Sequence, residues 1–222
     1  MSHLIVAIDG PAASGKSSTA RLVAKRLGFC HVDSGSLYRA ATAAALRRSG
    51  DADRWSEEDV RRAVGDITLR PVAGAVVPLL EGEELGEELR GAEVTRHVSR
   101  VAQMPRIREW VNELVRTSAS SHSVVVDGRD IGTVVFPHAD LKVFLVADPW
   151  ERARRRLLQR SAQSPSDEEI AAETERLVLR DARDATQTVQ ARDAVLIDTT
   201  HLTQDAQVER IVALVKVLPA RK

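Results

Sequence analysis

Residues 4–27 decide the fold, because they place a strand, a glycine-rich loop and a helix one after another. Leu4–Ile8 (LIVAI) is a continuous apolar run, which is typical of a strand buried on both faces. Gly10–Ser17 (GPAASGKS) matches the phosphate-binding pattern G-x-x-x-x-G-K-[ST]. Lys16–Leu27 then carries apolar residues at helical spacing and stops before Gly28. A strand before the loop and a helix after it are the context in which this pattern binds phosphate.

The phosphate loop predicts that the chain binds a nucleoside triphosphate with Mg²⁺. Its glycines let backbone N–H groups turn toward the phosphates, and the helix N-terminus adds a partial positive charge. We expect Lys16 to bridge the β- and γ-phosphates and the Ser17 hydroxyl to ligate Mg²⁺. The ATP-binding residues predicted from the loop are Gly10, Pro11, Ala12, Ala13, Ser14, Gly15, Lys16, Ser17 and Ser18.

The loop alone leaves kinases, GTPases and mechanical ATPases open. No Asn-Lys-x-Asp sequence follows a later strand, so guanine recognition is not supported, and 222 residues are few for a motor. A small-molecule kinase or an ATP-binding regulatory module remains.

Further strand and helix signals alternate along the chain. Apolar runs predict strands at 29–32, 124–126, 142–146 and 194–197. Continuous runs separated by helical patterns are typical of an α/β doubly wound fold, with a parallel sheet covered on both faces. Asp148 before Pro149, and Ser166 three residues before Glu169, predict the starts of two helices.

Two segments depart from this alternation. Residues 65–91 hold two short β-type runs split by Gly74 and then an acidic stretch, which predicts a small surface insert outside the main sheet. Residues 150–160 hold five arginines, and residues 161–176 hold five acids. An arginine-rich helix, a short hinge and a return helix would form a lid that closes on a transferring phosphoryl group. Ion pairs between two surface helices would also account for most of these charges.

The composition excludes several classes of protein. The chain has 32 Lys and Arg against 32 Asp and Glu, so it lacks the basic excess of most nucleic-acid-binding domains. It has one cysteine and no apolar run of membrane-spanning length, so we expect a cytoplasmic protein. Of the basic residues 27 are arginine, which suits bidentate phosphate recognition but also follows from a GC-rich genome. The six histidines show no metal-binding spacing, and we treat them as structural or exposed.

Three further segments carry polar residues that could meet a ligand. Val124–Asp130 (VVVDGRD) places two aspartates and an arginine at the carboxyl end of a buried strand, where open α/β sheets bind ligands. Asp33–Arg39 (DSGSLYR) follows another strand but also fits an ordinary turn and helix cap. Ser99–Arg108 by itself fits a charged surface helix.

In this order the motifs resemble those of bacterial cytidylate kinases, a branch of the nucleoside monophosphate kinases. The resemblance covers nearly the whole chain and is most specific at DGRDIGTVVFP, residues 127–137. It implies a five-stranded parallel sheet with helices on both faces, a small β-containing insert for the acceptor and a helical arginine-rich lid. The chain would form one P-loop kinase domain, 1–222, with its core at 1–64, 92–148 and 185–222, the insert at about 65–91 and the lid at about 150–184.

The resemblance also implies a reaction, the transfer of the γ-phosphoryl group of ATP to CMP or dCMP with Mg²⁺. Positioning and charge neutralisation by Lys16, Arg129 and Arg180 would carry catalysis without a general base. By family position, Arg39 and Arg129 would bind the acceptor phosphate, and Ser99, Arg108 and Asp130 would bind the base. Arg180 and Asp184 would supply the ribose and lid contacts, and Ser34 and Asp127 would also line the site. The implied partners are small molecules, with no nucleic acid and no membrane, and the implied state is a monomer.

One position departs from the family pattern. The family usually has an arginine three residues after the position of Asp184, where this chain has Gln187. Loss of a charge-assisted phosphate contact made in the transition state costs about ten- to a hundred-fold in rate. A nucleotide-binding relative without catalysis therefore stays open beside a kinase. A kinase for another acceptor is disfavoured, because Ser99, Arg108 and Asp130 are all present.

Overall fold

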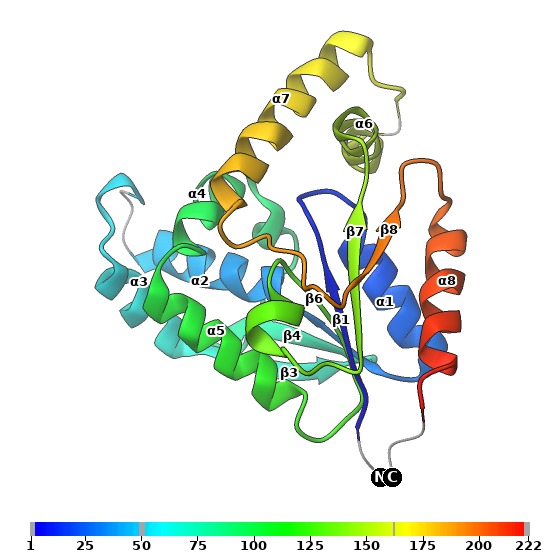
Figure 1. Ribbon diagram of the computed structural model, residues 1–222. Helices are drawn as coiled ribbons and strands as arrows, with labels where there is room; N and C mark the ends of the chain where they lie inside the picture. Colours follow the sequence, from blue (N-terminus) through cyan, green and yellow to red (C-terminus); the bar gives the residue numbers. More distant parts are fainter. Residues whose placement is uncertain (1–2, 49–51, 162, 220–222) are drawn as a thin grey trace.

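A parallel sheet forms the centre of the computed structural model, which describes residues 3–48, 52–161 and 163–219 (Figure 1). Five of its strands lie in the order β2-β6-β1-β7-β8, and every neighbouring pair among them is parallel. They are β2 (Cys30–Asp33), β6 (Val124–Asp127), β1 (Ile5–Asp9), β7 (Leu141–Val146) and β8 (Val195–Asp198). The predicted α/β class and five-stranded parallel core are confirmed, with strand ends within one residue of those expected.

The insert joins the main sheet, so the prediction that it lies outside that sheet was wrong. Its strands are β3 (Ile67–Val72), β4 (Ala75–Leu80) and β5 (Glu83–Glu84), and β4 is antiparallel to the other two. The start of β4 also pairs in parallel with β2, where the His31 N–H donates to the Gly74 carbonyl at 2.8 Å. Without β4, β2 would present unpaired N–H and C=O groups at the sheet edge. The insert therefore extends the sheet to the order β3-β4-β2-β6-β1-β7-β8.

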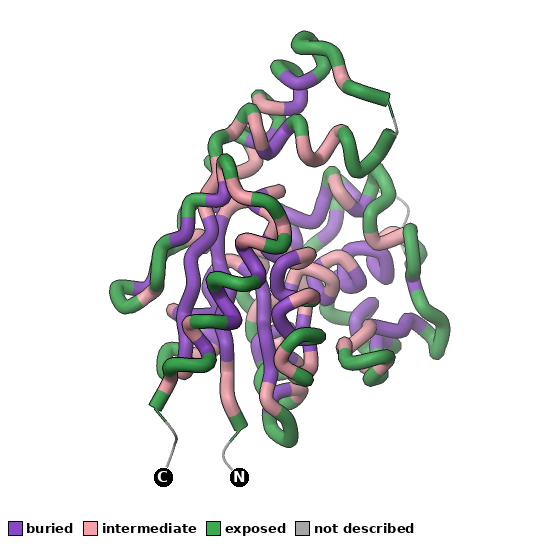
Figure 2. Tube along the Cα trace, turned by 90° about the vertical axis from the view of Figure 1, so that its right-hand side faces the viewer, coloured by how far each residue is buried: buried purple, intermediate pink, exposed green. Residues whose placement is uncertain are grey.

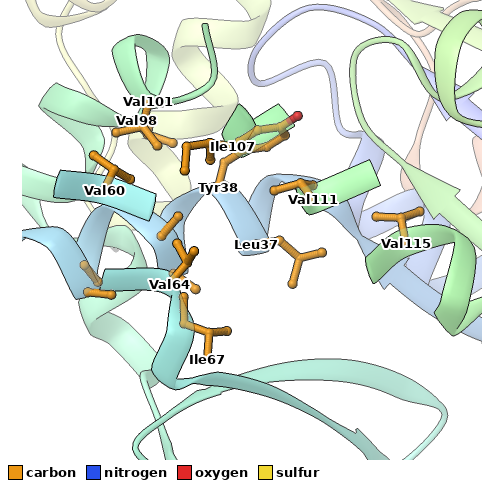
Figure 3. Close-up of a cluster of buried hydrophobic side chains, with 14 of the residues drawn as sticks. Leu37, Tyr38, Val60, Val64, Ile67, Val98, Val101, Ile107, Val111 and Val115 are labelled. Carbon is orange, nitrogen blue, oxygen red and sulfur yellow. The ribbon is translucent and has the colours of Figure 1, made fainter. Parts of the chain in front are cut away.

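Helices cover both faces of the sheet. One face carries α1 (Lys16–Leu27) and α8 (Gln204–Lys216), and the other carries α2 (Ser34–Arg48), α3 (Glu57–Ala63), α4 (Ala92–Val101) and α5 (Pro105–Ser118). Strand side chains alternate between the two cores, because Val6 and Ile8 of β1 belong to the α1–α8 core and Ala7 belongs to the other. Figure 2 shows how strongly the inner strands are buried. Figure 3 shows the second core around Leu37 and Ile107.

Helices α6 (Pro149–Arg160) and α7 (Asp167–Asp184) form a hairpin over the carboxyl ends of the strands (Figure 1). Asp148 caps α6, and Ser166 with Glu169 forms a capping box on α7, as predicted. A small apolar cluster packs the hairpin on the phosphate loop and consists of Ala12, Ala153, Ile170 and Leu177. No helix in the described ranges is both long and apolar enough to cross a bilayer.

Candidate active site

The phosphate loop joins β1 to α1 at the carboxyl edge of the sheet. Gly10 has a φ of 147°, and a Cβ there would lie 2.1 Å from the carbonyl oxygen of Leu145. Gly15 has a φ of 88° directly before α1. Both positions require glycine, because other residues rarely adopt these backbone angles. The loop can therefore curl closely around the end of the neighbouring strand β7.

Lys16 lies inside this loop, with 5% of the residue exposed. Its Nζ donates to the carbonyl of Pro11 at 2.5 Å and lies 3.4 Å from Oγ of Ser14. Burial, and after it the charge of Arg129, holds the Lys16 pKa well below its ordinary value. An anionic ligand in the loop would favour the charged ammonium form again. The position suits a lysine that neutralises a polyphosphate.

Ser17, the next residue, is joined to the end of β6. Its Oγ donates to Oδ2 of Asp127 at 2.5 Å, and Asp127 is 2% exposed. A hydroxyl and a carboxylate are hard oxygen ligands of the kind that Mg²⁺ prefers, so these two residues fit a magnesium ion. Within the described ranges, no three His, Cys, Asp or Glu side chains converge as a metal site. Phosphate oxygens would supply further ligands, as is usual for Mg²⁺ bound with nucleotides.

A pocket beside the phosphate loop gathers most of the predicted acceptor residues. Its lining comes from α2, α4, α5, α7, the turns that follow α4 and α7, and the loop that follows β6. The lining residues are Ser34, Gly35, Tyr38, Arg39, Val98, Ser99, Ala102, Arg108, Gly128, Arg129, Asp130, Arg180, Asp184 and Gln187. Of the nine predicted residues only Asp127 is absent from this lining, because it lies next to Ser17 and α1. Its backbone carbonyl accepts from Oγ of Ser34 at 2.8 Å, so it still adjoins the pocket.

One group of lining residues is an ion pair between Asp130, which is buried, and Arg108, which is half-buried. Arg108 also donates from Nη1 to the carbonyl of Ala102 at 3.0 Å, and Gln187 donates from Nε2 to the same carbonyl at 3.2 Å. Burial raises the pKa of Asp130, although the charge of Arg108 acts against this. Ser99 lies beside this pair and is 8% exposed. This group presents a carboxylate acceptor next to guanidinium N–H donors.

A second group of lining residues is strongly cationic. Nε of Arg129 and Nε of Arg180 lie 3.6 and 3.7 Å from the same oxygen of Asp184. Among the described residues, neither of these buried Nε groups has a hydrogen-bond acceptor. Burial and neighbouring cations lower the pKa values of Arg39 and Arg180 to about 10, and Arg156 of α6 is one of those cations. Two arginines on one carboxylate, with the charges of Arg39 and Arg156 nearby, suit a phosphate group.

Two buried residues of the site carry no motif that reveals them in the sequence. Asp9, at the end of β1, accepts from the N–H groups of Ile131 at 2.9 Å and Gly132 at 2.7 Å. Burial raises its pKa to about 6. His31 is bonded to Asp127, so it is one histidine that does belong to the site. The available signals were weak: Asp9 stands directly before Gly10, and His31 stands two residues before Asp33 on the same strand face.

A parallel α/β sheet with a phosphate loop at its carboxyl edge and a cationic pocket beside that loop defines a P-loop kinase. The family model described as "Cytidylate kinase" matches residues 6–217. A cytidylate kinase of Limosilactobacillus fermentum is 43% identical over 215 residues, which cover 93% of this chain and 92% of the relative. One of Chloroherpeton thalassium is 40% identical over 218 residues, with 95% and 92% covered. The chain belongs to the cytidylate kinase family.

A solved structure agrees in fold. The crystal structure of an uncharacterized protein from Eubacterium ventriosum superposes with a TM-score of 0.53 at 12% identity, over 97% of this chain and 99% of that one. At this identity the likeness concerns the fold alone.

Proposed function

We propose that this protein transfers the γ-phosphoryl group of ATP to CMP or dCMP, giving ADP and CDP or dCDP. The observation that carries the proposal is the pocket next to the phosphate loop, whose lining holds both the Arg108–Asp130 pair and the arginines Arg39, Arg129 and Arg180. A nucleoside monophosphate offers matching groups, a base and a dianionic phosphate. The relatives of this chain, named cytidylate kinases, support the same assignment.

The Arg108–Asp130 pair of the pocket suits cytosine. Cytosine presents an exocyclic amine donor, which a carboxylate such as that of Asp130 accepts, and ring acceptors, which a guanidinium such as that of Arg108 donates to. Uracil has a carbonyl in place of that amine, so it would face the Asp130 carboxylate with a second acceptor. The arrangement therefore favours CMP over UMP.

The arginines of the pocket support the transfer itself. An oxygen of the CMP phosphate, ionised at neutral pH, attacks the γ-phosphorus of ATP, and the bond to the β–γ bridging oxygen breaks to release ADP. Lys16, Arg129 and Arg180 would stabilise the charge on the transferring group, and no side chain needs to remove a proton. Ser17 and Asp127 would hold Mg²⁺, which when bound neutralises charge on the triphosphate.

The proposal divides the chain into working parts. Residues 10–18 bind ATP, the insert at about 65–91 helps to enclose the acceptor, and the α6–α7 hairpin acts as the lid within one domain. We also propose that the protein acts as a monomer. Its partners would be nucleotides and not a nucleic acid or a membrane, and its place of action the cytoplasm.

A binding module without catalysis, which Gln187 left open, is not favoured. Lys16, Arg129 and Arg180 all lie around the junction of the two sites, and their charges act on one another.

A coupled assay with ATP and a panel of CMP, dCMP, UMP and AMP tests the proposal. We expect CDP and dCDP to form, and Lys16→Met to lower kcat by about 10²- to 10³-fold, as for other transition-state donors. A preference for UMP or AMP would contradict the substrate assignment. Binding of ATP and CMP without CDP formation would favour the non-catalytic alternative.

A further inference from the structure

His31 lies on β2, on the sheet face that α1 covers. Side chains alternate along the strand, so His31 and Asp33 share this face while Val32 joins the opposite core. In the parallel register His31 stands beside Val125, and Asp33 stands beside Asp127 of β6. His31 is 7% exposed and does not line the acceptor pocket. The imidazole is thus placed diagonally across from the Asp127 carboxylate.

The Asp127 carboxylate is held at both oxygens. Nε2 of His31 lies 2.7 Å from Oδ1, and the Ser17 hydroxyl donates to Oδ2 at 2.5 Å. A carboxylate only accepts, so Nε2 carries the proton in this contact. The carboxylate stands between the serine and the histidine, whereas a hydrolytic triad has the histidine in the middle. This chain of contacts therefore orients Asp127 and does not activate Ser17 as a nucleophile.

The neighbouring carboxylates of Asp33 and Asp127 favour a hydrogen-bond donor such as His31 at this place. Asp33 and Asp127 are neighbours in register, and burial together with the charge of Asp127 raises the Asp33 pKa to about 6. The N–H of His31 therefore lies against one of two neighbouring carboxylates.

We propose that His31 is a positioning residue of the phosphoryl transfer, which holds Oδ1 of Asp127 so that Oδ2 stays directed at Ser17. The inference rests on the proposed function, because it assigns His31 to the same site. Partners behind a metal-binding carboxylate fix its orientation, and their loss weakens the site even though they touch neither metal nor substrate.

Two substitutions separate this role from packing. His31→Leu fills a similar space without a donor, whereas His31→Gln keeps an N–H near the place of Nε2. We expect His31→Leu to lower kcat by about ten- to a hundred-fold with the KM for CMP nearly unchanged, and His31→Gln to recover most of the loss. The exposed His138 provides a matched control, and His138→Leu should leave kcat unchanged. Thermal unfolding of each variant gives the folded fraction.

Calorimetric titration with ADP supplies a readout that needs no turnover. We expect His31→Leu to weaken binding of ADP with Mg²⁺ by about tenfold and to leave binding of ADP with EDTA unchanged. Nitrogen-15 NMR of the wild-type imidazoles adds a test on the unchanged chain. The His31 Nε2 signal should show the protonated nitrogen and should shift with ADP and Mg²⁺ but not with ADP and EDTA.

Three results would overturn the proposal. The first is an unchanged kcat per folded His31→Leu molecule, and the second is an equal loss of ADP affinity in this variant with and without Mg²⁺. The third is a His31 Nε2 NMR signal that does not shift when Mg²⁺ is added with ADP. If His31→Leu does not fold, the NMR titration of the wild type and the kcat of His31→Gln still test the proposal. A wild-type protein that forms no CDP would instead contradict the proposed function, while the ADP titrations would continue to test His31.

Discussion

Arg152 of α6 donates from Nη1 to Oδ2 of Asp181 on α7 at 2.6 Å, and both residues also hold Ala12 of the phosphate loop. Nη1 of Arg152 donates to the Ala12 carbonyl at 2.8 Å, and Oδ1 of Asp181 accepts from the Ala12 N–H at 3.1 Å. Arg152 therefore fastens the α6–α7 hairpin to the loop that would bind ATP. At least one arginine of the arginine-rich α6 has this structural task.

Removal of one partner should destabilise the protein, because the Arg152 side chain is only 5% exposed. We expect Asp181→Ala to lower the free energy of unfolding by about 2–3 kcal/mol, the scale of a lost hydrogen bond to a charged group that is left buried. The pair Arg26–Glu209 has the same 2.6 Å separation with side chains more than half exposed, so it is a matched control. Glu209→Ala should cost less than about 1 kcal/mol. Equal losses in urea unfolding would contradict the role assigned to burial.

Substrate recognition by the Arg108–Asp130 pair is tested by Asp130→Ala. Loss of a carboxylate that accepts from the cytosine amine should raise the KM for CMP by about ten- to a hundred-fold, equivalent to roughly 1.5–3 kcal/mol. The KM for ATP should change little, because Asp130 lines the acceptor pocket, where it pairs with Arg108, and is not part of the phosphate loop. Steady-state kinetics with each substrate varied in turn measures both values. Equal increases for CMP and ATP would mean that Asp130 shapes the whole site and does not read the base.

Arg156 should supply charge that the family usually obtains from the arginine at the position of Gln187. It is paired with Glu173 at 2.9 Å, and its charge acts on both Arg39 and Arg180. We expect Arg156→Met to lower kcat by at least about tenfold, as for loss of one charge-assisted contact in the transition state.

A double variant and a control sharpen this prediction. Gln187→Arg should restore part of the activity lost in Arg156→Met, because Gln187 lines the pocket that holds Arg39 and Arg180, on which the charge of Arg156 acts. Arg160→Met is the matched control, since Arg160 also lies near Glu173, at 3.7 Å, but its side chain is half exposed. Similar losses for Arg156→Met and Arg160→Met in kcat would refute the assignment.

Asp9 should make the free energy of unfolding depend on pH. Burial raises its pKa from 3.8 to about 6, although the N–H groups of Gly132 and Ile131 act against this. Between these pH values the folded protein holds a proton that the unfolded chain releases, so this group makes the protein less stable as the pH rises. Asparagine does not ionise. Relative to the wild type, Asp9→Asn should gain on the order of 2–3 kcal/mol of unfolding free energy between about pH 4 and pH 7.

Urea unfolding at several pH values measures this difference. The exposed Asp205 on α8 provides the control for loss of one carboxylate, as Asp205→Asn. A difference between Asp9→Asn and the wild type that stays constant from pH 4 to pH 7 would show that Asp9 is not the titrating group.

The strands, the phosphate loop and the helix caps could be predicted because their signals are local. Gly10, Gly15, Asp148 and Ser166 act on backbone groups within a few residues of themselves. Asp127, Arg129 and Asp130 could be predicted from their place after a buried strand. The other acceptor residues could be predicted only through family resemblance, which transfers positions without saying what each side chain contacts. The pairing of β4 with β2 was missed, because an acidic, glycine-split segment shows no sign of which sheet edge it will join.

The sequence by itself determined that residues 4–27 form a strand, a phosphate loop and a helix, because contiguous backbone preferences and apolar spacing encode them. Only the tertiary structure decided that His31, Asp127 and Ser17 form one chain of contacts, and that Asp181 binds Ala12. Asp127 lies 110 residues from Ser17, and Asp181 lies 169 residues from Ala12. Contacts at such separations depend on strand order, register and helix packing, which place distant side chains on the same face of the sheet.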